Sequence, residues 1–204
     1  MAVITISRHF GAGGWTLGER LAKKFGYHYI NEGMITEVAA QTNVSLEQVR
    51  ALEDRGADKL MRFLDKMVKT SYVERLTSDK HGFVDEKIYV DVVRNLIQDL
   101  YEQGDVVIIG RGSQYILQGL ANTWHLLLVG DLKYRIRFVM NKYKLSESEA
   151  EKAIQKRDQT RTRFLNFFSE SESHDDPLLY DLILNMSRLS LEKAEQMIED
   201  LIFN

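Results

Sequence analysis

The chain has 204 residues, of which 44% are hydrophobic and 28% are charged, close to the average for globular domains. This composition excludes a fibrous or largely disordered chain and fits one domain of ordinary size. Lysine and arginine number 27 against 30 aspartates and glutamates, and the net charge of −3 disfavours a protein that coats nucleic acid. The absence of cysteine excludes disulfides, thiolate metal sites and a cysteine nucleophile.

No stretch of the sequence has the length of a membrane span. The longest aliphatic runs, 106–109 and 126–129, are four residues each, whereas a spanning helix needs about 20. The apolar stretch 2–6 reaches Arg8 without the longer apolar region of a secretory signal. We therefore expect a cytoplasmic protein that does not bind membranes.

Short runs of β-branched and aliphatic residues alternate along the chain with segments of helical periodicity. In the first helix, Leu17, Leu21 and Phe25 recur every four residues, and Gly26 can end the helix. The expected strands are 3–7, 27–30, 105–110, 124–129 and 180–185. The later helices are expected at 33–41, 45–65 and 85–103, after residue 131, from residue 146 into 157–163, and at 191–202.

Capping residues and connection lengths extend this prediction to the fold. Ser146 and Glu149 have the spacing of a capping box, and Asp131 and Ser190 are expected N-caps. Strands separated by helices need crossover connections, which predicts a parallel α/β sheet. The apolar run 105–110 suits a strand that is buried on both faces of such a sheet.

The segment 7–18 carries a glycine-rich sequence between the first strand and the first helix. It reads Ser-Arg-His-Phe-Gly-Ala-Gly-Gly-Trp-Thr-Leu-Gly. Glycines bring backbone N–H groups close to an anion, and the helix N-terminus adds the positive end of its dipole. The pattern predicts a phosphate cradle in which Thr16 supplies a Mg²⁺-binding hydroxyl. The alternative is a glycine-rich turn that binds no ligand.

The loop lacks the lysine that supplies the positive charge in the P-loop pattern. Anchored on Thr16, G-x-x-x-x-G-K-[ST] requires glycine where His9 stands and lysine where Trp15 stands. No lysine lies in the loop. The bridging charge must therefore come from Arg8, Lys23 or an arginine elsewhere in the chain.

Arginines occur at two further places where they can bind anions. Arg111 lies between two glycines just after a predicted strand, where ligands bind in open α/β sheets, and its guanidinium can hold a phosphate or carboxylate. Arg157 and Arg161 are four residues apart and share one helix face, from which they can stabilise a transferring phosphoryl group. The alternatives are an arginine at 111 that lies on the surface or pairs with a nearby acid, and a solvated helix face at 157–163.

Several short motifs occur in a characteristic order. They are Ser7-Arg8 followed by Gly11-Ala12-Gly13-Gly14, then Gly110-Arg111, Arg135-Ile136, Asp158 with Arg161, and Tyr180-Asp181-Leu182 with Asn185. In their order and spacing the chain resembles the bacterial cytidylate kinase-like family of P-loop proteins. The resemblance runs through nearly the whole sequence and is least diagnostic over 45–85.

The resemblance implies a single domain over residues 1–204 with a three-layer α/β P-loop NTPase fold. Such a fold has a five-stranded parallel sheet, here with a helical inserted lobe at about 45–85 and an Arg-bearing lid at about 150–176. The implied reaction transfers the γ-phosphoryl group of ATP, with Mg²⁺, to a nucleoside monophosphate such as CMP or dCMP. The expected partner is thus a small nucleotide and no nucleic-acid polymer, with a homodimer left open.

The resemblance also implies a role for individual residues. ATP phosphates would be held by Gly11, Ala12, Gly13, Gly14, Trp15 and Thr16. The acceptor would be held by Arg111, Asn31 and Arg135, and the catalytic cations would be Arg157, Arg161 and Arg8.

Three departures from the family bear on activity. Cytidylate kinases have lysine where this chain has Gly14 and glycine where it has Arg8, and the turn 29–33 lacks the usual Asp-[Ser/Thr]-Gly-Ala. The alternative to a kinase is therefore a catalytically silent nucleotide-binding sensor.

Overall fold

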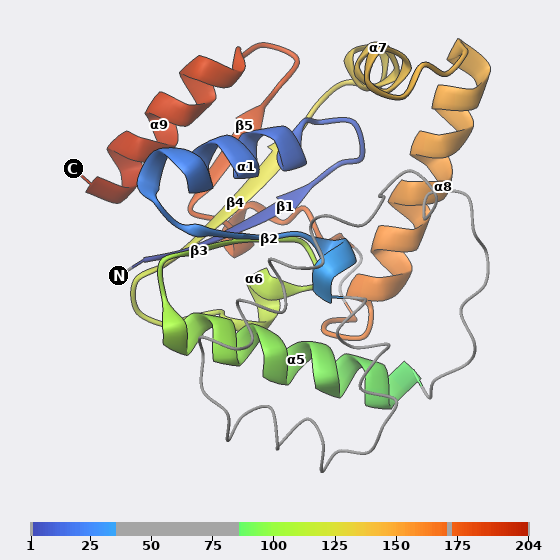
Figure 1. Ribbon diagram of the computed structural model, residues 1–204. Helices are drawn as coiled ribbons and strands as arrows, with labels where there is room; N and C mark the ends of the chain where they lie inside the picture. Colours follow the sequence, from blue (N-terminus) through green and yellow to red (C-terminus); the bar gives the residue numbers. More distant parts are fainter. Residues whose placement is uncertain (1, 36–85, 171–172, 204) are drawn as a thin grey trace.

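The computed structural model describes residues 2–35, 86–170 and 173–203 (Figure 1). The predicted helix 45–65 and the expected inserted lobe at 45–85 lie outside these residues. Of the helix expected at 33–41, only residues up to 35 are described, and they are helical from residue 32.

The described residues form a five-stranded, all-parallel sheet in the order β2-β3-β1-β4-β5. The strands are β1 (Val3–Arg8), β2 (His28–Ile30), β3 (Val106–Ile109), β4 (Thr123–Val129) and β5 (Leu182–Asn185). The central strand β1 pairs with β3 and β4 and places Ile6 beside both Ile109 and Leu126. Every residue of β3 is buried, as its uninterrupted apolar sequence predicts.

Helices cover both faces of the sheet. They are α1 (Gly14–Phe25), α5 (Glu86–Gln103), α6 (Ser113–Ile116), α7 (Leu132–Tyr143), α8 (Glu147–Leu165) and α9 (Leu191–Phe203), with a 3₁₀ turn at Pro177–Leu179. Figure 1 shows α1 and α9 on one face and α5 with α6 on the other, while α7 and α8 lie outside these layers. The arrangement confirms the expected three-layer fold.

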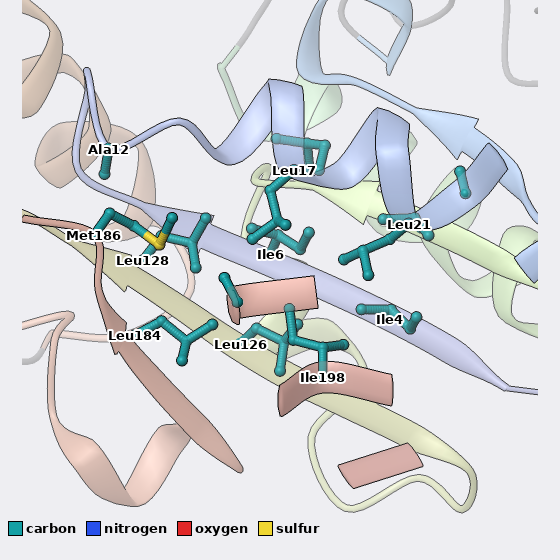
Figure 2. Close-up of a cluster of buried hydrophobic side chains, with 14 residues drawn as sticks. Ile4, Ile6, Ala12, Leu17, Leu21, Leu126, Leu128, Leu184, Met186 and Ile198 are labelled. Carbon is teal, nitrogen blue, oxygen red and sulfur yellow. The ribbon is translucent and has the colours of Figure 1, made fainter. Parts of the chain in front are cut away.

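Two apolar clusters hold the layers together. Side chains alternate along β1, so Ile4 and Ile6 pack against Leu17 and Leu21 of α1, as Figure 2 shows. Val3 instead belongs to the cluster on the α5 face. Because α1 packs directly on β1, its first turn is held beside the end of that strand, where the glycine-rich loop emerges.

The structure confirms the predicted helix caps. Asp131 accepts a hydrogen bond from the Tyr134 N–H at 2.8 Å, and Ser146 and Glu149 form a reciprocal capping box. Gly26 ends α1 in the left-handed conformation. These local signals depend on residues only a few positions apart, which is why the sequence predicts them well.

Three predicted strands are shorter than expected. The strand expected at 27–30 begins at residue 28, and the other two are limited by their backbone conformation. The strand expected at 105–110 spans 106–109, because Asp105 and Gly110 have φ of 50° and 71° and cannot continue an extended strand. The strand expected from 180 begins at Leu182, since a 3₁₀ turn runs to Leu179 and Tyr180 is its C-cap residue. None of the described helices is long and apolar enough to cross a bilayer.

Candidate active site

The carboxyl ends of β1, β2 and β3 open onto one cavity, which α8 borders on its far side. Four predicted arginines among the described residues line it: Arg8, Arg111, Arg157 and Arg161. They come from the end of β1, the turn after β3 and the last turns of α8. A parallel sheet brings its strand ends to one edge, so residues about 150 positions apart become neighbours.

Arg8 follows a path that two glycines leave open. A Cβ atom at Gly14 would lie 2.9 Å from Arg8 Cγ, and one at Gly110 would lie 2.1 Å from its Nη1. The side chain therefore runs from the start of α1 across the turn after β3. At its end, Nη2 donates to Glu32 Oε2 at 2.6 Å.

Arg111 occupies a strained turn. Its φ is 58°, between Gly110 at 71° and Gly112 at 72°, so three successive residues are left-handed. Such conformations cost a residue with a side chain about 1–3 kcal/mol and cluster at ligand sites. The guanidinium lies 5.0 Å from the ring centroid of Phe164, and Nε donates to the Glu32 carbonyl at 3.4 Å.

Glu32 lies among the arginines and its side chain is 26% exposed. Burial disfavours its charged form, but Arg8, Arg111 and Arg157 outweigh that effect and hold the pKa of Glu32 at about 2, below its ordinary 4.5. The carboxylate therefore stays charged at neutral pH and stabilises the clustered guanidinium groups.

Replacing Glu32 by glutamine should lower the free energy of unfolding at pH 7 by about 1–3 kcal/mol, because the partly buried arginines lose their counter-charge. Because the folded pKa of Glu32 lies below the ordinary value, its stabilisation is present above pH 4.5 and is lost as the pH falls toward 2. Urea unfolding from pH 7 to pH 3 measures the difference between wild type and Glu32→Gln. We expect the difference to shrink across this range, whereas a constant difference would contradict the ion-pair assignment. Glu19→Gln, at an exposed position of α1, is the control.

The arginines of α8 face the cavity together, as their four-residue spacing predicts. Arg161 Nη2 donates to Ser7 Oγ at 3.0 Å and to Asp175 Oδ1 at 2.8 Å. Arg157 places its guanidinium 5.9 Å from the ring centroid of Phe10. These contacts join α8 to the end of β1 and to the loop that follows it.

Arg135 and Asn31 lie outside the residues that line the cavity. Arg135 Nη1 donates to Asp158 Oδ2 at 2.6 Å and to the Phe10 carbonyl at 3.3 Å, so it fixes α8 to the glycine-rich loop. Asn31 Oδ1 accepts from the N–H groups of Gly33 and Met34, two and three residues further along the chain, at 2.9 and 3.1 Å. Their predicted contact with an acceptor stays a prediction.

The glycine-rich loop keeps the start of α1 open. Gly11 and Gly13 have φ of 86° and 84°, and Gly13 is the N-cap residue. Within the described part of the chain no side chain caps this helix, and its first turn contains no acidic residue. The N–H groups of the first turn can therefore face an anion. The cavity borders the loop through Arg8 and Phe10, and residues 11–16 lie outside its lining.

Glu32 and Gln114 are among the cavity residues for which the sequence predicts no function of their own. Glu32 was part of the expected acceptor turn 29–33, and Gln114 follows the Gly-Arg motif. The available signal for both was their position just after strand ends, where ligands bind in α/β sheets. That signal does not distinguish a substrate contact from an internal ion pair.

The charges at this site favour an anionic ligand. The cavity and the ion pairs beside it contain five arginines and three carboxylates, a net charge of +2 among the described groups. The whole chain has a net charge of −3, so the positive field is local. This local charge matches a phosphate dianion.

An all-parallel sheet with a glycine-rich loop after β1, next to converging arginines, defines a P-loop kinase fold. The chain belongs to the Cytidylate kinase-like family, whose sequence model matches residues 3–188. A cytidylate kinase from Staphylothermus marinus is 24% identical over 206 residues, which span 99% of this chain and 97% of that protein.

Solved structures show the same fold. An uncharacterized protein from Eubacterium ventriosum superimposes with a TM-score of 0.71 at 20% identity, covering 99% of this chain and 98% of the other. A shikimate kinase from Bacteroides thetaiotaomicron superimposes with a TM-score of 0.52 at 15% identity, covering 98% of each chain.

Proposed function

We propose that this protein transfers the γ-phosphoryl group of ATP to a nucleoside monophosphate, with CMP or dCMP as the first acceptors to test. The convergence of Arg8, Arg111, Arg157 and Arg161 on one cavity beside the start of α1 carries this proposal. Phosphoryl transfer is achieved mainly by positioning and by neutralising charge, which a cluster of cations next to a phosphate loop can do. The family and the distant cytidylate kinase relative support it.

The cavity suggests a division of roles. Residues 11–16 and the start of α1 would bind the ATP phosphates, and Arg111 would bind the acceptor phosphate at the end of β3. Arg157 and Arg161, within the proposed lid at about 150–176, would cover the transferring group and exclude water. The attacking atom is a phosphate oxygen, so no general base is required.

The binding of Mg²⁺ at this site would require few protein ligands. Among the described residues, no three histidine, aspartate or glutamate side chains cluster as a metal site. Mg²⁺ commonly keeps several waters and binds through substrate phosphates, so Thr16 in the first turn of α1 is a sufficient protein ligand. ATP·Mg²⁺ would supply the phosphoryl group and neutralise part of its charge.

Arg8 is the proposed substitute for the loop lysine. Its stem fills the space in front of Gly14, where a lysine side chain would begin, and its guanidinium extends over Gly110. The cation would thus reach the phosphates from the end of β1 rather than from the start of α1. Glu32 holds this guanidinium in place through their ion pair.

A single-turnover assay tests the reaction itself. Concentrated protein is mixed with [γ-³²P]ATP·Mg²⁺ and each of CMP, dCMP, UMP, AMP and GMP. We expect labelled CDP or dCDP. No labelled diphosphate in samples that demonstrably bind ATP would contradict the proposal and favour a nucleotide sensor.

Replacing Gly13 by aspartate should abolish the rise in melting temperature that ATP·Mg²⁺ causes, because a carboxylate would face the phosphates at the start of α1. Gly13 has a φ of 84°, which asparagine tolerates better than most residues, and its Cβ would meet only Phe138 at 3.7 Å. Gly13→Asn is therefore a matched control that adds similar bulk without charge. Thermal unfolding with and without ATP·Mg²⁺ measures the difference, and equal behaviour of the two variants would contradict the assignment of the loop.

A further inference from the structure

One donor in the cavity has no hydrogen-bond partner among the residues that the structure describes. The side chains of Arg135, His9, Ser113 and Gln114 each bury a polar atom that lacks a hydrogen bond among the described residues. Of these, only Gln114 lines the cavity, where it is 1% exposed and its Nε2 is the unpartnered atom. Buried amide groups are nearly always hydrogen-bonded, so this N–H group is suited to a ligand atom.

The position of Gln114 relates it to the proposed acceptor site. It lies in the first turn of α6, three residues after Arg111, and both side chains line the cavity. Phe164 and Leu165 line the cavity too, and the Arg111 guanidinium packs on the ring of Phe164. The cavity therefore combines cationic groups with apolar surface and a neutral donor.

Each of these features suits a different part of one molecule. The guanidinium groups supply the charge that binds a phosphate, so the neutral amide N–H of Gln114 is left to pair with a carbonyl oxygen or ring nitrogen elsewhere in the ligand. The aromatic and aliphatic surfaces suit a flat ring. A phosphate joined to a heterocyclic base has all three properties.

We propose that Gln114 Nε2 donates a hydrogen bond to the base of the acceptor nucleotide and so selects nucleoside monophosphates over phosphates that carry no base. This inference rests on the proposed function and adds a specificity residue to it. A site that leaves a buried donor unpaired with the wrong ligand discriminates strongly against that ligand.

The test compares two ligands that share a phosphate and a sugar. Calorimetry measures the Kd of CMP and of ribose 5-phosphate for wild type, Gln114→Leu and Gln114→Met, each in the presence of ADP·Mg²⁺. We expect wild type to bind CMP more tightly, and both variants to weaken CMP about tenfold while leaving ribose 5-phosphate unchanged. Ser113→Ala is the matched control, because Ser113 is also buried with an unpartnered oxygen but does not line the cavity.

The outcomes separate this inference from the kinase reaction. Unchanged CMP affinity in both variants, or an equal loss for CMP and ribose 5-phosphate, would overturn the role of Gln114. A wild type that prefers neither ligand would overturn it as well. Labelled CDP from wild type together with unchanged affinities would reject only this inference. Gln114-dependent CMP binding without labelled CDP would reject the kinase and retain the binding role.

Discussion

Replacing Arg8 by glycine should lower kcat for phosphoryl transfer about 10²–10³-fold, and adding Gly14→Lys to that variant should restore a large part of the loss. The magnitude is typical for removing one group that stabilises transition-state charge. The restoration is expected because the double variant returns the cation to the start of α1, where cytidylate kinases carry it.

The geometry makes the two positions interdependent. A Cβ at Gly14 would lie 2.9 Å from Arg8 Cγ, so Gly14→Lys alone must displace the Arg8 side chain and should also reduce kcat. With Arg8→Gly the same space is empty. The effects of the two substitutions should therefore be far from additive, as for residues in direct contact.

A double-mutant cycle measures this coupling. It consists of single-turnover rates for wild type, both single variants and the double variant, each with its melting temperature. Arg8→Lys, which keeps the charge but loses the planar guanidinium, should retain more activity than Arg8→Gly. Additive losses at equal stability would show that Arg8 does not replace the loop lysine.

Arg111→Ala should weaken CMP binding about 100-fold and change ATP binding by less than about twofold. A guanidinium that binds a phosphate through two charge-assisted hydrogen bonds contributes energy of this size when buried. The selectivity is expected because Arg111 follows β3, whereas the proposed ATP loop follows β1.

Arg94→Ala is the matched control for this substitution. Arg94 of α5 lies 5.5 Å from the ring centroid of Phe168 and does not line the cavity, so its removal also deletes an arginine–aromatic contact in the same cluster. Calorimetric titration of both variants with CMP and with a non-hydrolysable ATP analogue measures the effects. Equal losses of CMP and ATP affinity in Arg111→Ala would contradict the proposal that Arg111 binds the acceptor.

Much of the fold could be predicted from the sequence because its signals are local. The apolar residues 106–109 predict a doubly buried strand, and Ser146 with Glu149 predicts the start of α8, since each signal needs only adjacent residues or one helical turn. The predicted strand starts at Asp105 and Tyr180 were less accurate, because a backbone turn precedes each strand and the strand begins one or two residues later than side-chain chemistry suggests.

The sequence by itself determined the parallel α/β architecture, the place of the glycine-rich loop and the membership of a kinase-like family. Only the tertiary structure decided that the arginines of β1, the turn after β3 and α8 share one cavity, because that depends on pairing between distant segments. The sequence could not predict that the Arg8 side chain passes over Gly14 and Gly110, nor that it forms an ion pair with Glu32. Spacing along a chain identifies residues that share a helix face, whereas the clearance between side chains exists only once the layers are packed.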